Sequence, residues 1–197
     1  MANLWFTSDN HFGHKNILKF CPETRPFASI EEHDAAQIAN FQKLVKPEDT
    51  VWFLGDVFFC NDRRAAEILA QIPGHKHLVY GNHDQTIKKT HNIRHMFEST
   101  QDYKELRVDG INVVLFHFPM MEWNRMHHGA YALFGHVHGS LDNDPLVLSG
   151  RTMDVGVDSR PAGVVNTNGF LAPWDWNQVH QILGARPRRA HHNKVVD

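Results

Sequence analysis

The segment Thr-Val-Trp-Phe-Leu-Gly-Asp at residues 50–56 is a continuous apolar run that ends in a glycine and a carboxylate. Four consecutive bulky apolar residues suit a β-strand that is covered on both faces, as in the parallel sheet of an α/β protein. Gly55 lets the backbone turn, so we expect Asp56 at the carboxyl end of this strand, where open α/β sheets gather their ligand sites. A Gly-Asp pair also suits an ordinary turn. The functional interpretation therefore depends on what else the chain brings to this position.

Other segments repeat the pattern and place Asp, Asn or His directly after an apolar stretch. The residues concerned are Asp9, Asn10, His11, Asn82, His83, Asp84, His117, His136 and His138. They offer oxygen and imidazole ligands and no thiolate, which favours Mn, Fe, Zn, Mg or Ni over a sulfur-bound structural metal. Residues i and i+2 of an extended chain point the same way, so Asp9 and His11 can reach one metal ion.

With these segments in place, the chain resembles the calcineurin-like metallophosphoesterases, and within them a small bacterial and phage-type branch. The pattern of that superfamily is Asp-x-His, Gly-Asp, Gly-Asn-His-Asp/Glu, a later His, and Gly-His-x-His. All five blocks occur here in order between Asp9 and His138, and residues 154–158, Asp-Val-Gly-Val-Asp, extend the likeness. The chain departs from the pattern after Asp56. Many members carry a second Asp there that orients the catalytic His, whereas Val-Phe-Phe follows here at residues 57–59.

The resemblance implies a centre with two divalent metal ions, preferably Mn²⁺, with Fe, Zn, Ni or Mg as alternatives. It assigns to one ion Asp9, His11, Asp56 and His138, and to the other Asp56, Asn82, His117 and His136. Asp56 is then the bridge between the two ions. His83 is not a ligand in this scheme and is placed to protonate the leaving oxygen, with Asp84 as a candidate to hold its ring.

The function that the resemblance implies is hydrolysis of phosphodiester bonds by a metal-bridging hydroxide at this dinuclear centre. Diesters are preferred because the chain lacks the Asp-Arg-Gly that follows Gly-Asp in protein phosphatases. Two alternatives stay open. One is a phosphomonoesterase that acts on nucleotides or proteins, and the other is a metal-bearing binding scaffold without catalysis.

Three further residues are candidates for contacting the substrate. His14 follows closely on His11, where it could touch a phosphate, although a solvated or capping histidine is an equal alternative. Trp123 lies in the loop after His117 and could stack on a base, or it is a core residue. His127, in the same loop, offers an imidazole donor. The expected partner is a small phosphate ester, with a nucleotide-like ester as one option.

Composition bounds the remaining possibilities. A chain of 197 residues with 42% hydrophobic content can bury one substantial core, so we expect a single domain at residues 1–185 and a polar tail at 186–197. The net charge of −2 gives no strong signal for nucleic-acid binding. The two cysteines suggest neither a metal pair nor a disulfide framework, and no apolar run has the length of a membrane span. We therefore expect a soluble cytoplasmic protein with no membrane partner; the sequence carries no signal for an oligomeric state.

Alternating strand and helix patterns predict an α/β fold, a four-layer sandwich of two mixed β-sheets flanked by α-helices as in the resembled family. Ser29 and Glu32 form a capping box for a helix over residues 30–44. The Asp-Gly pair at residues 109–110 predicts a hairpin, from which we expect antiparallel pairing in the second sheet. We also expect a last strand at residues 151–157 and a closing helix that opens at residues 173–176.

Overall fold

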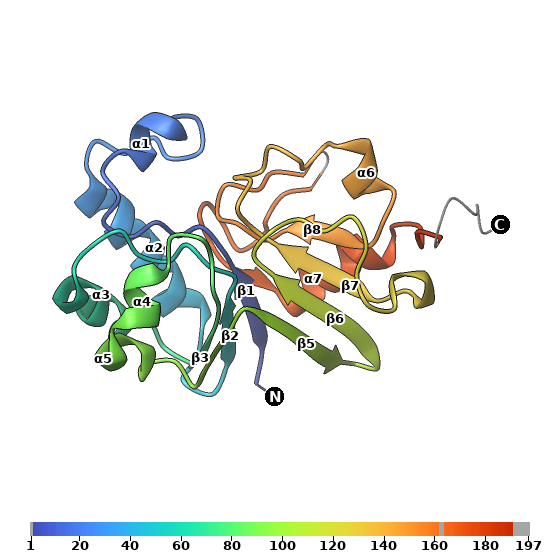
Figure 1. Ribbon diagram of the computed structural model, residues 1–197. Helices are drawn as coiled ribbons and strands as arrows, with labels where there is room; N and C mark the ends of the chain where they lie inside the picture. Colours follow the sequence, from blue (N-terminus) through green and yellow to red (C-terminus); the bar gives the residue numbers. More distant parts are fainter. Residues whose placement is uncertain (1, 162–163, 191–197) are drawn as a thin grey trace.

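Two β-sheets face each other across a hydrophobic core in the computed structural model, which describes residues 2–161 and 164–190 (Figure 1). The first sheet has the strand order β4-β3-β2-β1-β9. Its strands are β1 (Leu4–Thr7), β2 (Thr50–Phe53), β3 (His75–Val79), β4 (Ser99–Gln101) and β9 (Trp174–Asp175). The first four are parallel, and β9 runs antiparallel along β1. The sheet is therefore mixed, as predicted.

Strand β2 lies at the middle of this sheet and is covered on both faces, which confirms the prediction from residues 50–56. Val51 and Phe53 point into the core beneath the helices, whereas Trp52 and Leu54 point into the core between the two sheets. This alternation follows from the period of two residues in a β-strand. Because both of its faces are apolar and covered, the strand has no solvent-exposed side.

Helices cover the outer face of the first sheet. They are α2 (Ile30–Leu44), α3 (Asp62–Leu69), α4 (Gln85–Lys89) and α5 (His91–Arg94), while α1 (Ile17–Phe20) stands beside the strand ends (Figure 1). The predicted helix at residues 30–44 is confirmed. The Ser29 side chain accepts a hydrogen bond from the Glu32 N–H, at 3.2 Å, and the Glu32 carboxylate reaches back to the N–H of Ala28.

The second sheet has the order β5-β6-β7-β8. Its strands are β5 (Tyr103–Val108), β6 (Ile111–Phe116), β7 (Tyr131–Phe134) and β8 (Thr152–Asp154). Asp109 and Gly110 join β5 to β6 with positive φ angles of 49° and 80°, as a two-residue hairpin turn requires. Only this pair is antiparallel; β6, β7 and β8 are parallel. The expectation of antiparallel pairing fails beyond the hairpin because long connections allow a crossover between parallel strands.

The closing helix begins later than the sequence predicts. Trp174 and Asp175 form β9 rather than the first turn of a helix, and α7 (Trp176–Gly184) begins one residue later. Asp175 accepts a hydrogen bond from the Gln178 N–H at 3.0 Å, so it caps the helix while still belonging to the strand. Val179 and Leu183 of α7 then pack into the core between the sheets.

The predicted tail begins with residues that contact the domain. Arg186 donates to the carbonyl of Thr152, and Arg189 donates to the carbonyl of Met121 at 2.8 Å. Residues 191–197, which include His191 and His192, lie outside the described residues, so the tail boundary stays a prediction. Within the part of the chain that the structure describes, no helix combines the length and apolar character needed to cross a membrane.

Candidate metal centre

The carboxyl ends of strands from both sheets meet at one place, and the predicted metal ligands follow these strand ends (Figure 1). The first sheet contributes Asp9 and His11 after β1, Asp56 after β2 and Asn82 after β3. The second sheet contributes His117 after β6, and His136 and His138 after β7. The site therefore depends on the packing of one sheet against the other.

Five of these residues have a left-handed backbone conformation. The φ angles are 55° at Asp9, 50° at His11, 54° at Asp56, 72° at His136 and 50° at His138. Only eight non-glycine residues in the described part of the chain have positive φ, so more than half of them are predicted ligands. Such conformations are strained for residues with a Cβ and cluster at functional sites, where the surrounding fold enforces them. Here the sharp turns bring consecutive ligands to one centre.

Asp9, His11 and His138 form a first group whose ligand atoms all lie within 4.8 Å of one another. Asp9 Oδ2 accepts a hydrogen bond from the His136 N–H at 2.8 Å. Asp9 Oδ1 and His11 Nε2 are buried and have no hydrogen-bond partner among the described residues. A buried acceptor without a partner is destabilising, and burial raises the pKa of the Asp9 carboxyl. A cation between these atoms would satisfy both, so the group fits a metal ion.

Asp56, His117 and His136 form a second group within the same 4.8 Å limit. His117 Nδ1 lies 2.7 Å from the Leu54 carbonyl and donates to it, which directs Nε2 into the site. Nε2 is 3.0 Å from Asn82 Oδ1 and 3.5 Å from Asp56 Oδ2. Burial would lower the pKa of His117, but the hydrogen bond to Asp56 and the charge of Asp9 raise it. The surroundings thus favour a positive charge at this point, from a proton or from a metal ion.

His11 and His138 differ in how the protein controls their charge. Burial lowers the pKa of His11, as does the nearby charge of Arg25, so this imidazole stays neutral as a metal ligand must. Burial would also lower the pKa of His138, but its hydrogen bond to Asp158 and the charge of Asp9 raise it to about 10. In the absence of a metal ion, His138 therefore holds a proton that a metal ion would displace.

Asp158 and Arg25 are site residues that the sequence analysis did not assign. Asp158 Oδ2 lies 2.6 Å from His138 Nδ1, which leaves His138 Nε2 facing Asp9 Oδ1 at 4.0 Å. The Arg25 guanidinium pairs with Asp158 through two nitrogens, at 2.5 and 2.9 Å, and both side chains are fully buried. A carboxylate behind a histidine fixes the tautomer and orientation of a metal ligand. Asp158 lay within the segment 154–158 that extended the resemblance, whereas nothing in the sequence singled out Arg25.

The prediction that Asp84 holds the ring of His83 is wrong. The buried Asp84 carboxylate accepts hydrogen bonds from the N–H groups of Gly81, Asp56 and Val57, at 2.7, 2.8 and 3.0 Å. The turns after β2 and β3 direct three N–H groups at one point, and both oxygens of Asp84 are used there. Asp84 therefore positions the backbone of Asp56 rather than an imidazole.

Phe59 belongs to the segment 57–59, where the chain departs from the family pattern, and its ring packs against three histidines. Its ring stacks on His11 at 4.7 Å and on His14 at 4.1 Å, and it lies 4.7 Å from the ring of His83. His83 is exposed, and its N–H donates to Asp56 Oδ1 at 2.8 Å. His14 Nδ1 is 3.0 Å from His11 Nδ1, so His14 lies beside a predicted ligand, and its contact with a phosphate stays a prediction. The rings of Phe59, His14 and His83 therefore lie beside His11 of the first group.

Trp123 and His127 lie outside the two ligand groups. Trp123 is buried at 8% exposure, packs with Met126 and Ala132, and donates from Nε1 to the Ala130 carbonyl at 2.9 Å. Of the two alternatives left open for Trp123, the structure supports the core residue. His127 lies in a short 3₁₀ helix, η1 (Met126–His128), before the amino end of β7, whereas His136 follows its carboxyl end. The strand lies between them in the chain, and the contact of His127 with substrate stays a prediction.

Comparisons with known proteins agree with this geometry. Residues 4–149 match the family model of the calcineurin-like phosphoesterase superfamily domain. The Gene 66 protein of Mycobacterium phage L5 is 30% identical in an alignment of 191 residues in length, and the match covers 81% of this chain and 88% of that protein. Protein MJ1445 of Methanocaldococcus jannaschii is 29% identical over 162 residues, covering 80% and 83% of the two chains. The crystal structure of AQ665 from Aquifex aeolicus has the same fold, with a TM-score of 0.71, 24% identity, and coverage of 92% of this chain and 99% of that chain.

Proposed function

The chain belongs to the calcineurin-like phosphoesterase superfamily, whose members are metal-dependent, and on this premise we propose that it hydrolyses phosphodiesters with two divalent metal ions. The observation that carries the proposal is the pair of buried ligand atoms, Asp9 Oδ1 and His11 Nε2, that lack a partner among the described residues. Their arrangement suits a cation. If these were only turn residues with no ligand, both buried atoms would be expected to have hydrogen-bond partners.

The two groups suggest which residues hold each ion. Asp9, His11 and His138 would hold the first, and Asp56, His117 and His136 the second. Asn82 Oδ1 lies beside His117 Nε2 at 3.0 Å and is available to the second ion. When bound, two such ions neutralise the charge of the phosphate and lower the pKa of water. Nitrogen and oxygen donors of this kind suit Mn²⁺, which we retain as the preferred metal.

His83 supplies the proton for the leaving oxygen in this proposal. The hydrogen bond from its N–H to Asp56 Oδ1 fixes the residue beside the second group, and its exposed ring lies 6.2 Å from the ring of His11. A general acid must reach the substrate and donate a proton to it, and an exposed imidazole is accessible to do so. Phe59 packs against this ring and limits its orientations.

The charge of the surroundings favours a diester over a monoester. A monoester carries about two negative charges at neutral pH and a diester carries one. Arg25 is the guanidinium behind the site, but it is 1% exposed, and its donors are used by Asp158 and by the carbonyls of Asp9 and Asn10. It is therefore not available to hold the additional charge of a monoester.

Hydrolysis of bis-p-nitrophenyl phosphate and p-nitrophenyl phosphate by Mn²⁺-loaded protein tests the proposal. We expect two metal ions per chain, faster hydrolysis of the diester, and loss of both activity and metal in Asp56→Asn. Asp56 belongs to the second ligand group, and in the family pattern it also bridges to the first ion. Faster hydrolysis of the monoester would support a phosphomonoesterase instead. Two bound ions without hydrolysis of either ester would support a binding scaffold.

A further inference from the structure

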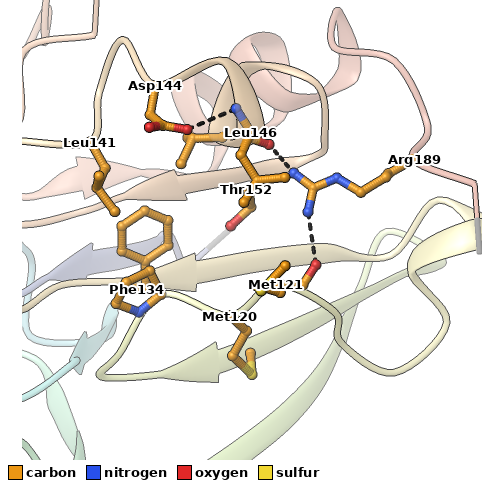
Figure 2. Close-up of a pocket in the computed structure, with 10 residues that line it drawn as sticks. Met120, Met121, Phe134, Leu141, Asp144, Leu146, Thr152 and Arg189 are labelled. Atoms are coloured by element: carbon orange, nitrogen blue, oxygen red, sulfur yellow. Dashed lines mark hydrogen bonds between the residues drawn. The ribbon is translucent and has the colours of Figure 1, made fainter. Parts of the chain in front are cut away.

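Two cavities lie along the second sheet on the side away from the first sheet. They differ in whether the guanidinium groups that line them have hydrogen-bond partners. The first, of about 190 Å³, is lined mainly by apolar side chains such as Met120, Phe134 and Leu141 (Figure 2). Arg189 borders it, and its guanidinium donates to the carbonyls of Met121 and Leu146 (Figure 2). The guanidinium group of Arg189 therefore has backbone carbonyls as partners, and this cavity gives no indication of a bound anion.

The second cavity is strongly cationic. It has a volume of about 230 Å³, and among the ten described residues that line it none is acidic. Four arginines and a histidine line it, namely Arg107, Arg125, His128, Arg151 and Arg188. The chain as a whole has a net charge of −2, so this concentration of positive charge is local. It went unnoticed in the sequence because its members are spread over more than 80 residues.

Two of the guanidinium groups converge on the same point of the cavity wall. A methyl group in place of the Gly129 hydrogen would lie 3.2 Å from Arg188 Nε and 3.4 Å from Arg151 Nη1. Gly129 has a φ of 88°, and Arg125 also has a left-handed conformation, with a φ of 61°. The turn between them folds the chain back so that Arg125 faces the same cavity.

Most of these charges have no protein partner. Within residues 2–161 and 164–190, the guanidinium groups of Arg107, Arg125 and Arg188 make no hydrogen bond or ion pair. Arg151 is anchored, because it donates to the carbonyls of Arg186 and Gly184 at 3.2 and 3.3 Å. Like charges held close together repel one another, and an anion between them converts this repulsion into attraction.

We propose that this cavity binds an anionic phosphate group, held between Arg107, Arg125 and Arg188. Guanidinium groups suit this ligand because their planar N–H pairs match phosphate oxygens. The volume is below the range of about 300–1,000 Å³ for sites that enclose a drug-sized ligand, so it suits the phosphate group rather than a whole nucleotide. Asn112, opposite Arg107 in the hairpin, adds an amide donor.

This site is separate from the metal centre. The cavity includes Ile111 at the amino end of β6, whereas His117 follows the carboxyl end of the same strand. A strand of six residues spans about 20 Å. In Figure 1 the turn between β5 and β6 lies at the end of the second sheet that faces away from the ends of β1 and β2. The proposal therefore does not depend on the proposed activity.

Titration of inorganic phosphate into Mg²⁺- or Zn²⁺-loaded, ¹⁵N-labelled protein tests the site, with the amide signals of Gly110 and Gly129 as reporters. We expect both signals to shift with saturation. We expect the affinity read from them to fall by about tenfold or more in the double variant Arg107→Ala/Arg125→Ala, because hydrogen bonds to charged groups are lost. Arg63→Ala is the matched control, since Arg63 is 90% exposed on α3 and its removal should change nothing.

Activity on bis-p-nitrophenyl phosphate should be the same in the double variant as in the unmodified protein, and Arg125→Lys, which keeps the charge, should retain most of the binding. Tighter binding of adenosine monophosphate than of inorganic phosphate would identify a phosphorylated nucleoside as the ligand, and equal binding would identify the phosphate group alone. Signals of Gly110 and Gly129 that do not move, or an affinity unchanged in the double variant, would overturn the proposal.

Discussion

Asp158 belongs to neither of the two ligand groups, but it contacts His138, a member of the first group. It accepts from His138 at 2.6 Å and pairs with the buried Arg25. Replacement by Asn keeps the shape but removes the charge that orients His138 and balances Arg25. We expect metal affinity to fall by about 10- to 100-fold in Asp158→Asn.

The same variant should lose about 3–5 kcal/mol of folding free energy, because Arg25 becomes an uncompensated buried charge. Metal titration at a temperature where the variant is still folded separates the two effects. Asp62→Asn, on the surface of α3, is the control. Unchanged metal affinity in Asp158→Asn would mean that His138 does not depend on this carboxylate.

His83 is the residue whose chemistry can be separated from metal binding. In His83→Asn we expect both metal ions to remain while the hydrolysis of nucleoside or alkyl esters falls by about 10²- to 10⁴-fold. The loss on p-nitrophenyl esters should be smaller, because p-nitrophenolate leaves readily without a proton. Equal losses on both substrate classes would show that His83 positions the phosphate, and a lost metal ion would make His83 a ligand.

At the scale of elements, the close approach of strand ends requires glycine at particular positions. A Cβ at Gly135, directly after β7, would lie 1.9 Å from Ser8 Oγ and 2.5 Å from Asp9 Oδ2. The end of β7 must therefore move away from the end of β1 in Gly135→Ala, which separates His136 and His138 from Asp9. We expect this variant to fold with reduced stability and to bind metal poorly.

Gly184→Ala is the matched control at the end of α7. A Cβ there would meet its nearest neighbour, Tyr131 Oη, at 3.5 Å, which is ordinary contact, so metal content should not change. Thermal unfolding and metal analysis of the two variants provide the comparison. Normal metal content in Gly135→Ala would contradict the close packing of the two strand ends.

The elements that the sequence predicted well are those with local causes. The helix over residues 30–44 has a capping box, and the hairpin has an Asp-Gly turn, so each is specified by adjacent residues. The parallel pairing of β6, β7 and β8, and the short strand β9, depend on where distant parts of the chain lie. No local pattern contains that information, which is why both were missed.

The residues of the site show the same difference between features with local causes and features that depend on distant parts of the chain. The ligand motifs stand at strand ends that their own sequence specifies, and the structure brings them together from both sheets. The supporting residues are less visible, because Arg25 is linked to Asp158 across 133 positions of sequence. Asp84 was misassigned because adjacency to His83 suggested a side-chain contact, whereas the turn directs its carboxylate toward backbone N–H groups.

For the whole molecule, metal binding should stabilise the packing of the two sheets, because each proposed ion takes ligands from both. Saturation at 100 times the dissociation constant stabilises the folded state by about 2.7 kcal/mol per site. We expect chelation to lower the melting temperature and added Mn²⁺ to restore it. An unchanged melting temperature after complete metal removal would contradict this.

The stabilisation should depend on pH. The pKa of His138 is about 10 in the metal-free fold, above its ordinary value of 6.5, so its proton stabilises that fold fully below about pH 6.5 and less as the pH rises through about 10. Metal binding displaces this proton and therefore strengthens as the pH rises. The rise in melting temperature on adding metal should be larger at pH 8.5 than at pH 6.5. An equal or smaller rise would mean that no proton is displaced.

The most direct test of the two-ion centre is a crystal structure of the Mn²⁺-loaded protein with anomalous scattering data collected near the manganese edge. We predict two anomalous peaks about 3.5–4 Å apart, one in contact with Asp9, His11 and His138, and the other with Asp56, His117 and His136. A single peak, or a peak held instead by Cys21, His138 and Asp158, whose ligand atoms also lie within 4.8 Å of one another, would contradict the account.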